Sequence, residues 1–173
     1  LAQCVRSRGA TVIFAMRPLT GNLIGRVREN GFPVVEIGEQ FGDAPIAEEM
    51  DAEQCADAIQ NSPHVHESTE TQASWLIVDH YGLGQKWESK SRLVASHILT
   101  IDDIANRVHD ADVLLDQNLV KDYENRYDHL VAENSVKLLG PEYALIASQY
   151  KALRRDTHRI DGNIENILIY FGG

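Results

Sequence analysis

Asp79, His80 and Tyr81 are the residues best suited to chemistry, and they directly follow the apolar run WLIV at 75–78. A carboxylate, an imidazole and a phenol can bind the hydroxyl and amide groups of a polar substrate, and one of them could transfer a proton. A buried strand requires the apolar run, but only a site at the end of that strand requires the three polar side chains. The stretch WLIVDHYGLGQKWE therefore predicts a strand, a binding site and a glycine turn, in that order.

Two further strand-like runs also end in polar clusters, one at Asp102 and Asp103 and the other at 116–118 (DQN), which includes Asn118. In open parallel sheets the ligand crevice lies outside the carboxyl ends of the strands, so we expect the three clusters to share one edge. Asp and Asn after a strand are also ordinary turn formers and helix caps. For Asp102 and Asp103 the sequence favours that structural role, as a cap before a helix over 104–109.

Other candidate residues give weaker indications. His64 and His66 form a pair that could bind a metal, but no third ligand is evident, so we expect them to be solvated. His97 lies within an apolar run, which is typical of a core histidine. There is no phosphate-binding glycine loop, and the basic segment 151–159 is expected to be a solvated surface. The sequence therefore predicts no metal and no cofactor.

The elements around these residues alternate between strand and helix. Strands are expected over 11–16, 33–37, 74–79, 136–140 and 166–171, with one or two over 92–102 and another over 111–118. Residues at 52, 55, 56 and 59 predict a buried helix face. This alternation predicts an α/β fold with a parallel, Rossmann-like sheet in one domain spanning 1–173. The expected strand core consists of Ile13, Phe14, Ile77, Val78, Val113, Leu114 and Ile169.

Composition restricts the classes of partner. The formal net charge is -10 and the pI is near 5.1, which argues against a nucleic-acid partner. No apolar run approaches the ~20 residues of a membrane span, and no signal peptide is evident. Cys4 and Cys55 form no metal or disulfide pattern, so both are expected to be core residues in a reducing compartment. The expected location is the cytoplasm.

Both ends of the sequence predict a fragment. The opening LAQCVRSRG is typical of the last turns of a helix that stops at Gly9, and NILIYFGG at the other end is typical of a strand that leads into a further element.

Four motifs in order, LIVDHYGLGQKWE, IDDIANRVHDADVLLDQNL, KLLGPEYALI and NILIYFGG, carry a resemblance over essentially the whole chain. They resemble the UDP-2,4-diacetamido-2,4,6-trideoxy-β-L-altropyranose hydrolases of pseudaminic acid biosynthesis and their spore-coat polysaccharide relatives. The resemblance implies a glycosyltransferase-B architecture, of which this chain would be the amino-terminal domain. It also implies release of UDP from a sugar by water that attacks the anomeric carbon, without a metal.

The resemblance also implies which parts of such an enzyme are missing. The catalytic histidine of the family lies in a glycine-rich loop after the first strand, upstream of LAQCVRSRG, and none of the seven histidines here matches it. The first strand and the carboxyl-terminal UDP-binding domain are absent as well, so the chain is expected to be inactive alone. The loss of a central strand would expose backbone donors and acceptors on its neighbours.

Among the retained motifs, the resemblance implies that the DHY segment contacts the sugar and orients the water. Tyr81 is the first choice, because a phenol both donates and accepts hydrogen bonds. Asp79 and His80 follow, and Asn118 and Tyr143 are second contacts.

Two other classes of function stay open. One is a sugar transferase of the same architecture, in which this domain would bind the acceptor, since fold alone does not decide chemistry. The other is a non-catalytic binding module. Transfer to an acceptor without release of free sugar would favour the first, and a natural 173-residue product with no longer form would favour the second.

Overall fold

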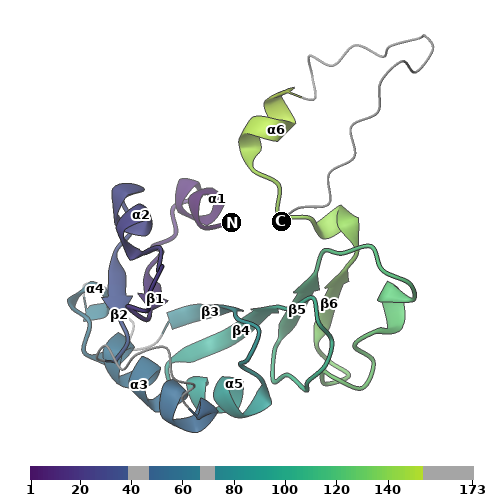
Figure 1. Cartoon of the computed structure of the whole chain (residues 1–173), viewed down its shortest axis with the longest axis horizontal. Helices are drawn as coiled ribbons and strands as arrows, with labels where there is room; N and C mark the ends of the chain where they lie inside the picture. The colour runs from purple at the N-terminus through teal and green to yellow at the C-terminus, as the bar shows by residue number, and fades with distance from the viewer. Residues whose placement is uncertain (39–46, 67–72, 154–173) are drawn as a thin grey trace.

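The structure is a computed structural model that describes residues 1–38, 47–66 and 73–153 (Figure 1). Helices and strands alternate along most of the described chain, as the sequence predicts. In chain order the elements are α1 (Ala2–Ser7), β1 (Phe14–Met16), α2 (Ile24–Glu29), β2 (Val34–Glu36), α3 (Glu48–Gln60), α4 (Pro63–His66), β3 (Ala73–Asp79), α5 (Gln85–Ser91), β4 (Ala95–Ile101), β5 (Val113–Asp116), the 3₁₀ turn η1 (Tyr123–Asn125), β6 (Val136–Leu139), the 3₁₀ turn η2 (Pro141–Tyr143) and α6 (Ser148–Leu153).

The strands form two sheets, and every strand pair in them is parallel. One sheet has the order β3-β4-β5-β6 and the other consists of β1 and β2. Figure 1 shows the small sheet beyond the β3 side of the large one, with β1 facing β3. Helices lie between β1 and β2, between β2 and β3 and between β3 and β4. Parallel strands with helical crossovers are consistent with a Rossmann-like fold, so the α/β class with parallel sheets is confirmed.

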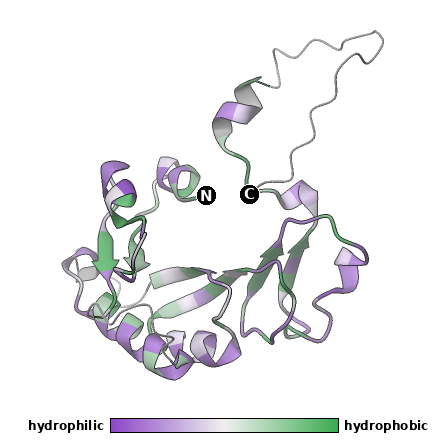
Figure 2. Ribbon diagram, viewed as in Figure 1, coloured by the Kyte–Doolittle hydropathy of each residue, from purple (hydrophilic) through white to green (hydrophobic). Residues whose placement is uncertain are grey.

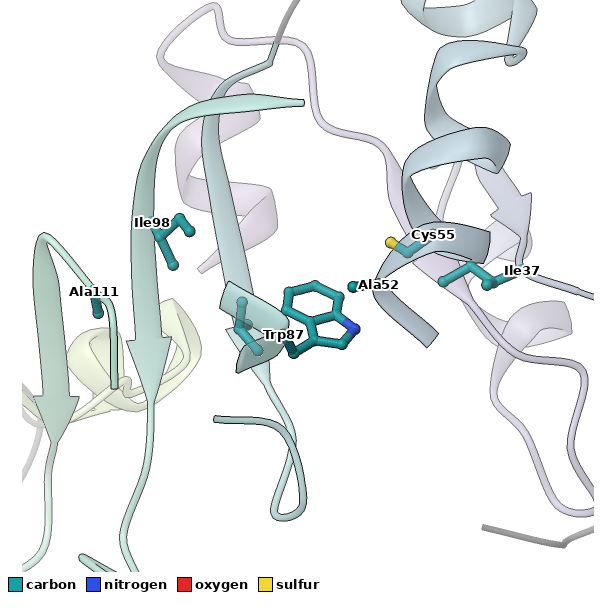
Figure 3. Packing of buried hydrophobic residues seen from close by; sticks show 7 residues of the cluster. Ile37, Ala52, Cys55, Trp87, Ile98 and Ala111 are labelled. Atoms are coloured by element: carbon teal, nitrogen blue, oxygen red, sulfur yellow. The ribbon is translucent and has the colours of Figure 1, made fainter. Parts of the chain in front are cut away.

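One apolar core serves both sheets. Trp87 points from α5 toward Ala52 on α3 (Figure 3), and both belong to a buried cluster that includes Ile98 of β4. Ala15 of β1 and Leu76 of β3 pack against the same cluster. The small and large sheets are therefore held together through α3 and α5.

The large sheet has two unlike faces. We call the face that contains Leu76, Val78, Ile98, Thr100 and Leu114 the covered face, because α5 packs on it. The alternate positions form the open face: Trp75, Ile77, His97, Leu99, Val113 and Val136, together with Leu115, which is the buried exception near the carboxyl end of β5. Figure 2 shows hydrophobic colour on the strands, most plainly on β2, and more hydrophilic colour on α3 and α5. On the open face, apolar side chains such as Trp75 and Ile77 are 48% and 44% exposed.

Part of the predicted strand core is wrong. Val78 and Leu114 are buried as expected, but Ile77 lies on the open face, and Phe14 and Val113 are only half-buried. Ile13 is half-buried and precedes β1, which begins at Phe14. The seventh predicted core residue, Ile169, lies outside the described residues.

Three smaller expectations also need correction. His97 is no core histidine: it is largely exposed and lies against Trp75, with ring centroids 4.9 Å apart. Cys4 is exposed, whereas Cys55 is buried, and burial raises the pKa of its thiol to about 12. No helix follows Asp102. That carboxylate instead accepts a hydrogen bond from the N–H of Ala105 at 2.9 Å and closes a turn.

In the described part of the chain, no helix has the length and apolar character needed to cross a bilayer.

Candidate functional site

The carboxyl ends of the four parallel strands bring the three predicted polar clusters to one edge of the large sheet. Asp79 is in register with Ile101 of β4, which is in register with Leu115 of β5. The loops that follow β3, β4 and β5 therefore begin side by side. We call this the carboxyl edge, and it includes the loop after β6, because Asp116 is in register with Leu139.

The segment after β3 is open to solvent. Asp79, His80 and Tyr81 are all exposed, and the exposed fraction of Tyr81 is 71%. Within the described part of the chain, no hydrogen bond occupies the side chains of Asp79 or Tyr81. The N–H of Gly82 donates to Nδ1 of His80 at 3.0 Å, so in the neutral imidazole Nε2 carries the proton and can donate to a ligand.

The loops after β5 and β6 add amide and phenol groups to this edge. Nδ2 of Asn118 donates to the carboxylate of Asp103 at 3.2 Å, which leaves its Oδ1 free to accept. The side-chain oxygen of Gln117 accepts from the N–H of Leu145 at 2.8 Å, and this bond ties the loop after β6 to the loop after β5. Tyr143, in η2, is 40% exposed. The structure thus places all five predicted site residues at one edge: Asp79 at the end of β3, Tyr143 in η2, and His80, Tyr81 and Asn118 on loops.

Beneath the exposed groups, the covered face ends in buried charges. The hydroxyl of Tyr127 donates to Asp102 at 2.9 Å and lies 3.2 Å from Asp116, and all three residues are almost fully buried. Arg126 forms an ion pair with Asp116, with an Nη1–Oδ2 distance of 2.6 Å. Arg126 also donates to the carbonyls of Asp103 and Ile104, so it joins the loops after β4 and β5.

A second buried group lies under the loop after β4. The carboxylate of Glu88, on α5, accepts from Thr100 at 2.7 Å and from the N–H of Asp110 at 2.6 Å. Its Oε1 also lies 2.7 Å from Nδ1 of His109. Nε2 of His109 is 3.9 Å from Asp102 and has no hydrogen-bond partner in the described part of the chain.

The surroundings of Asp102 favour its charged form. Burial by itself would raise the pKa of this carboxyl. The N–H of Ala105, the hydroxyl of Tyr127 and the guanidinium of Arg107 together outweigh it, so the pKa is lowered. The reverse holds for Tyr127: burial first, and then the hydrogen bond to Asp102, raise the pKa of the phenol, which keeps it a hydrogen-bond donor.

Sequence reasoning missed the residues that hold this edge together: Arg107, Arg126, Glu88, His109 and Tyr127. One signal was available for Glu88, which lies between Trp87 and Ser91 at the spacing of a buried helix face. The segment 104–109 was expected to be a helix, and in a helix Arg107 would have been assigned to solvent. No local pattern indicates the distant partners of Arg107 and Arg126.

The arrangement can bind a neutral polar ligand. It offers an acceptor at Asp79, a donor at Nε2 of His80, a phenol at Tyr81 and an acceptor at Asn118, all facing solvent. The buried carboxylates already have cationic or hydrogen-bonding partners inside the protein. Across residues 1–38, 47–66 and 73–153, no group of three or more His, Cys, Asp or Glu side chains is arranged to hold a metal ion.

In comparisons with known proteins, no known family profile matches the chain, and no curated protein sequence matches it significantly.

Proposed function

We propose that this chain is the sugar-binding part of a cytoplasmic nucleotide-sugar hydrolase that releases UDP from a diacetamido-trideoxy sugar. The observation that carries the proposal is the convergence of exposed hydrogen-bonding groups after β3, β5 and β6 at the carboxyl edge of a parallel sheet. Ligands of open α/β sheets bind at this edge. The four motifs described above support the choice of reaction and sugar.

In the proposed reaction, water attacks the anomeric carbon and UDP leaves. Tyr81 orients that water or a sugar hydroxyl through its free phenol, while Asp79 accepts from a hydroxyl group. Nε2–H of His80 donates to a carbonyl of an acetamido group, and Asn118 and Tyr143 contact the other side of the sugar. The general base and most UDP contacts would come from parts of the protein outside these 173 residues, so the chain alone binds sugar without hydrolysing the nucleotide.

The same proposal includes a further strand between the two sheets. In the described chain β1 pairs with β2 alone and β3 pairs with β4 alone. Yet β1 and β3 pack against one shared core through Ala15 and Leu76. A parallel strand between them would join the two sheets into one, as the proposed glycosyltransferase-B architecture requires.

A binding experiment tests the proposal on the chain as it is. Saturation-transfer NMR with the UDP-linked diacetamido sugar should show transfer to the acetamido methyl groups, and Asp79→Asn should weaken it. Asp57→Asn is a matched control, because Asp57 is an exposed carboxylate on α3 and lies on none of the loops of the carboxyl edge. No transfer in the wild-type chain, or equal loss in both variants, would contradict the proposed site.

An activity experiment separates hydrolysis from transfer. The longest product of the gene that encodes this chain should release both UDP and free sugar when it is given the nucleotide sugar alone. If UDP appears only when an acceptor is added, and no free sugar forms, the protein is a transferase and the hydrolase proposal is wrong.

A further inference from the structure

Arg107 connects the loop after β4 to the loop that carries the DHY segment. Its Nε donates to the carbonyl of Leu83 at 2.7 Å, and its Nη2 donates to the carbonyl of His80 at 2.8 Å. These two carbonyls stand on either side of Tyr81 in the chain. One planar guanidinium therefore donates hydrogen bonds to both ends of the short segment that contains Tyr81.

The third contact of Arg107 anchors the guanidinium to the sheet. Its Nη1 lies 2.9 Å from Oδ1 of Asp102, as an ion pair whose N–H groups are not directed at that oxygen. Asp102 itself is fixed by the hydroxyl of Tyr127 and by the N–H of Ala105, each at 2.9 Å. The guanidinium thus rests on a buried carboxylate whose own position is already determined.

The residues that follow Arg107 in the chain are also fixed in position. The N–H of His109 donates to the carbonyl of Leu130 at 2.7 Å, and its imidazole lies against Glu88. The N–H of Asp110 also donates to Glu88. Arg107 therefore extends from a stretch that is held at both ends by buried groups.

The two loops also touch through their backbones. The N–H of Gln85 donates to the carbonyl of Val108 at 2.9 Å. A Cβ on Gly84 would lie 3.2 Å from that same carbonyl and 3.4 Å from Cδ of Arg107, so the approach leaves little room for a side chain. The N–H of Gly84 donates instead to Glu48 of α3 at 3.1 Å, so the amide of Gln85 is the one that reports on whether the two loops stay together.

Arg107 has few donors left for a ligand. Three of its N–H groups already make hydrogen bonds, to Leu83, His80 and Asn106, and its charge is paired with Asp102. Its side chain is only 17% exposed. A phosphate-binding arginine would present its fork to solvent, whereas here the fork is occupied by the protein.

We propose that Arg107 is the positioning residue of the carboxyl edge: it holds Asp79, His80 and Tyr81 in the arrangement that binds substrate, without touching the substrate itself. The role as a substrate-positioning group rests on the proposed function, whereas the mechanical link between the two loops does not. Lysine cannot replace it, because one ammonium group cannot reach two carbonyls and a carboxylate with the planar geometry of the guanidinium.

Hydrogen exchange followed by mass spectrometry tests the link. Arg107→Lys should speed exchange of the Gln85 amide by about tenfold, because the lost hydrogen bonds make local opening easier. The amides of β5 should keep their protection. Arg17→Lys is a matched control: Arg17 is 14% exposed and has three contacts of its own, to Asp51, Gln54 and the carbonyl of Ile37.

Ligand binding tests the positioning role in the same variants. Arg107→Lys should weaken binding of the UDP-linked diacetamido sugar by about tenfold, and Arg17→Lys should leave it unchanged. Gly84→Ala provides a milder disturbance of the same contact if Arg107→Lys does not fold, and it should shift both readouts in the same direction.

Two outcomes would overturn the inference. Unchanged exchange of the Gln85 amide in both Arg107→Lys and Gly84→Ala would show that Arg107 does not hold the loop. Faster exchange with unaltered sugar affinity would show that the loop does not position the substrate. If the wild-type chain binds no nucleotide sugar, the proposed function fails, and the exchange contrast between Arg107→Lys and Arg17→Lys still decides whether the link exists.

Discussion

The two faces of the large sheet are built from the same strands but are covered to different extents. On the covered face Ile98 and Leu114 are fully buried beneath helix and loop. On the open face Val136 is 53% exposed, and Trp75 and Ile77 are nearly as accessible. Apolar residues on both faces are typical of parallel strands that are covered on both sides. The composition of a strand therefore indicates whether one or both of its faces can be buried. The elements that pack beside the sheet decide which face is buried in the fold.

The difference continues to the carboxyl ends of the strands. Thr100, Asp102 and Asp116 follow the covered face and end in a closed network of hydrogen bonds and ion pairs. Asp79 follows the open face and ends in solvent beside Tyr81. One face therefore leads to groups that stabilise the edge, and the other leads to groups that are free to bind.

The largest effect is expected at Glu88, which is fully buried beneath the covered side of the edge. Glu88→Ala removes the acceptor shared by Thr100, Asp110 and His109, so three buried groups lose their partner. The variant should lower the free energy of unfolding by about 3–5 kcal/mol, measured by urea denaturation. Glu133→Ala, at an exposed position, should cost less than about 0.5 kcal/mol. A similar small loss at Glu88 would show that its charge has no structural role.

A smaller effect is expected where the two faces are compared directly. Leu114→Ala on the covered face should lower the free energy of unfolding by about 3 kcal/mol, since it leaves a cavity in a closed core. Ile77→Ala on the open face should cost about 1 kcal/mol, because much of that side chain is already in water. Equal costs in urea denaturation would mean that something covers the open face in solution.

The next effect is the pH dependence of the free energy of unfolding that Asp102, on the covered side, contributes. The pKa of Asp102 is lowered from its usual value near 3.8, so the charged carboxyl contributes stability above about pH 4, and that contribution is lost as the pH falls through the lowered pKa. Tyr127→Phe removes a donor to this carboxylate and should cost about 1–2 kcal/mol at pH 7.

Denaturation of both proteins across pH 2–7 measures this contribution. The gap in stability between wild type and Tyr127→Phe should narrow as the pH falls through the pKa of Asp102, which is lowered from its usual value near 3.8. A gap that stays constant with pH would show that Tyr127 stabilises the core by packing alone.

The sequence was sufficient for the strands of the described chain and for the shared edge, because period and turn residues are local signals; the strand predicted over 166–171 lies outside the described residues. Val78 followed by Asp79 gave both the buried strand and the exposed cluster at its end. It was insufficient for Ile77, since nothing in a strand reveals whether a helix lies over a given face. It was also wrong for Asp102, which closes a turn where a helix is expected, and it gave no sign of the role of Arg107, whose two carbonyl partners lie 24 and 27 residues away in the chain.

The smallest effect on stability, and the most informative for function, is expected at Tyr81. Its phenol is exposed and has no partner in the described chain, so Tyr81→Phe should leave the melting temperature unchanged. In a protein that hydrolyses the nucleotide sugar, loss of one hydrogen bond worth about 0.5–1.5 kcal/mol should reduce kcat/KM by about 2- to 12-fold. A loss beyond about a hundredfold would indicate that Tyr81 takes part in proton transfer. Unchanged activity would remove Tyr81 from the site and leave Asp79, His80 and Asn118 as its binding groups. In that case the open side of the edge would bind the sugar through its carboxylate, imidazole and amide, still held in place by the buried groups beneath the covered face.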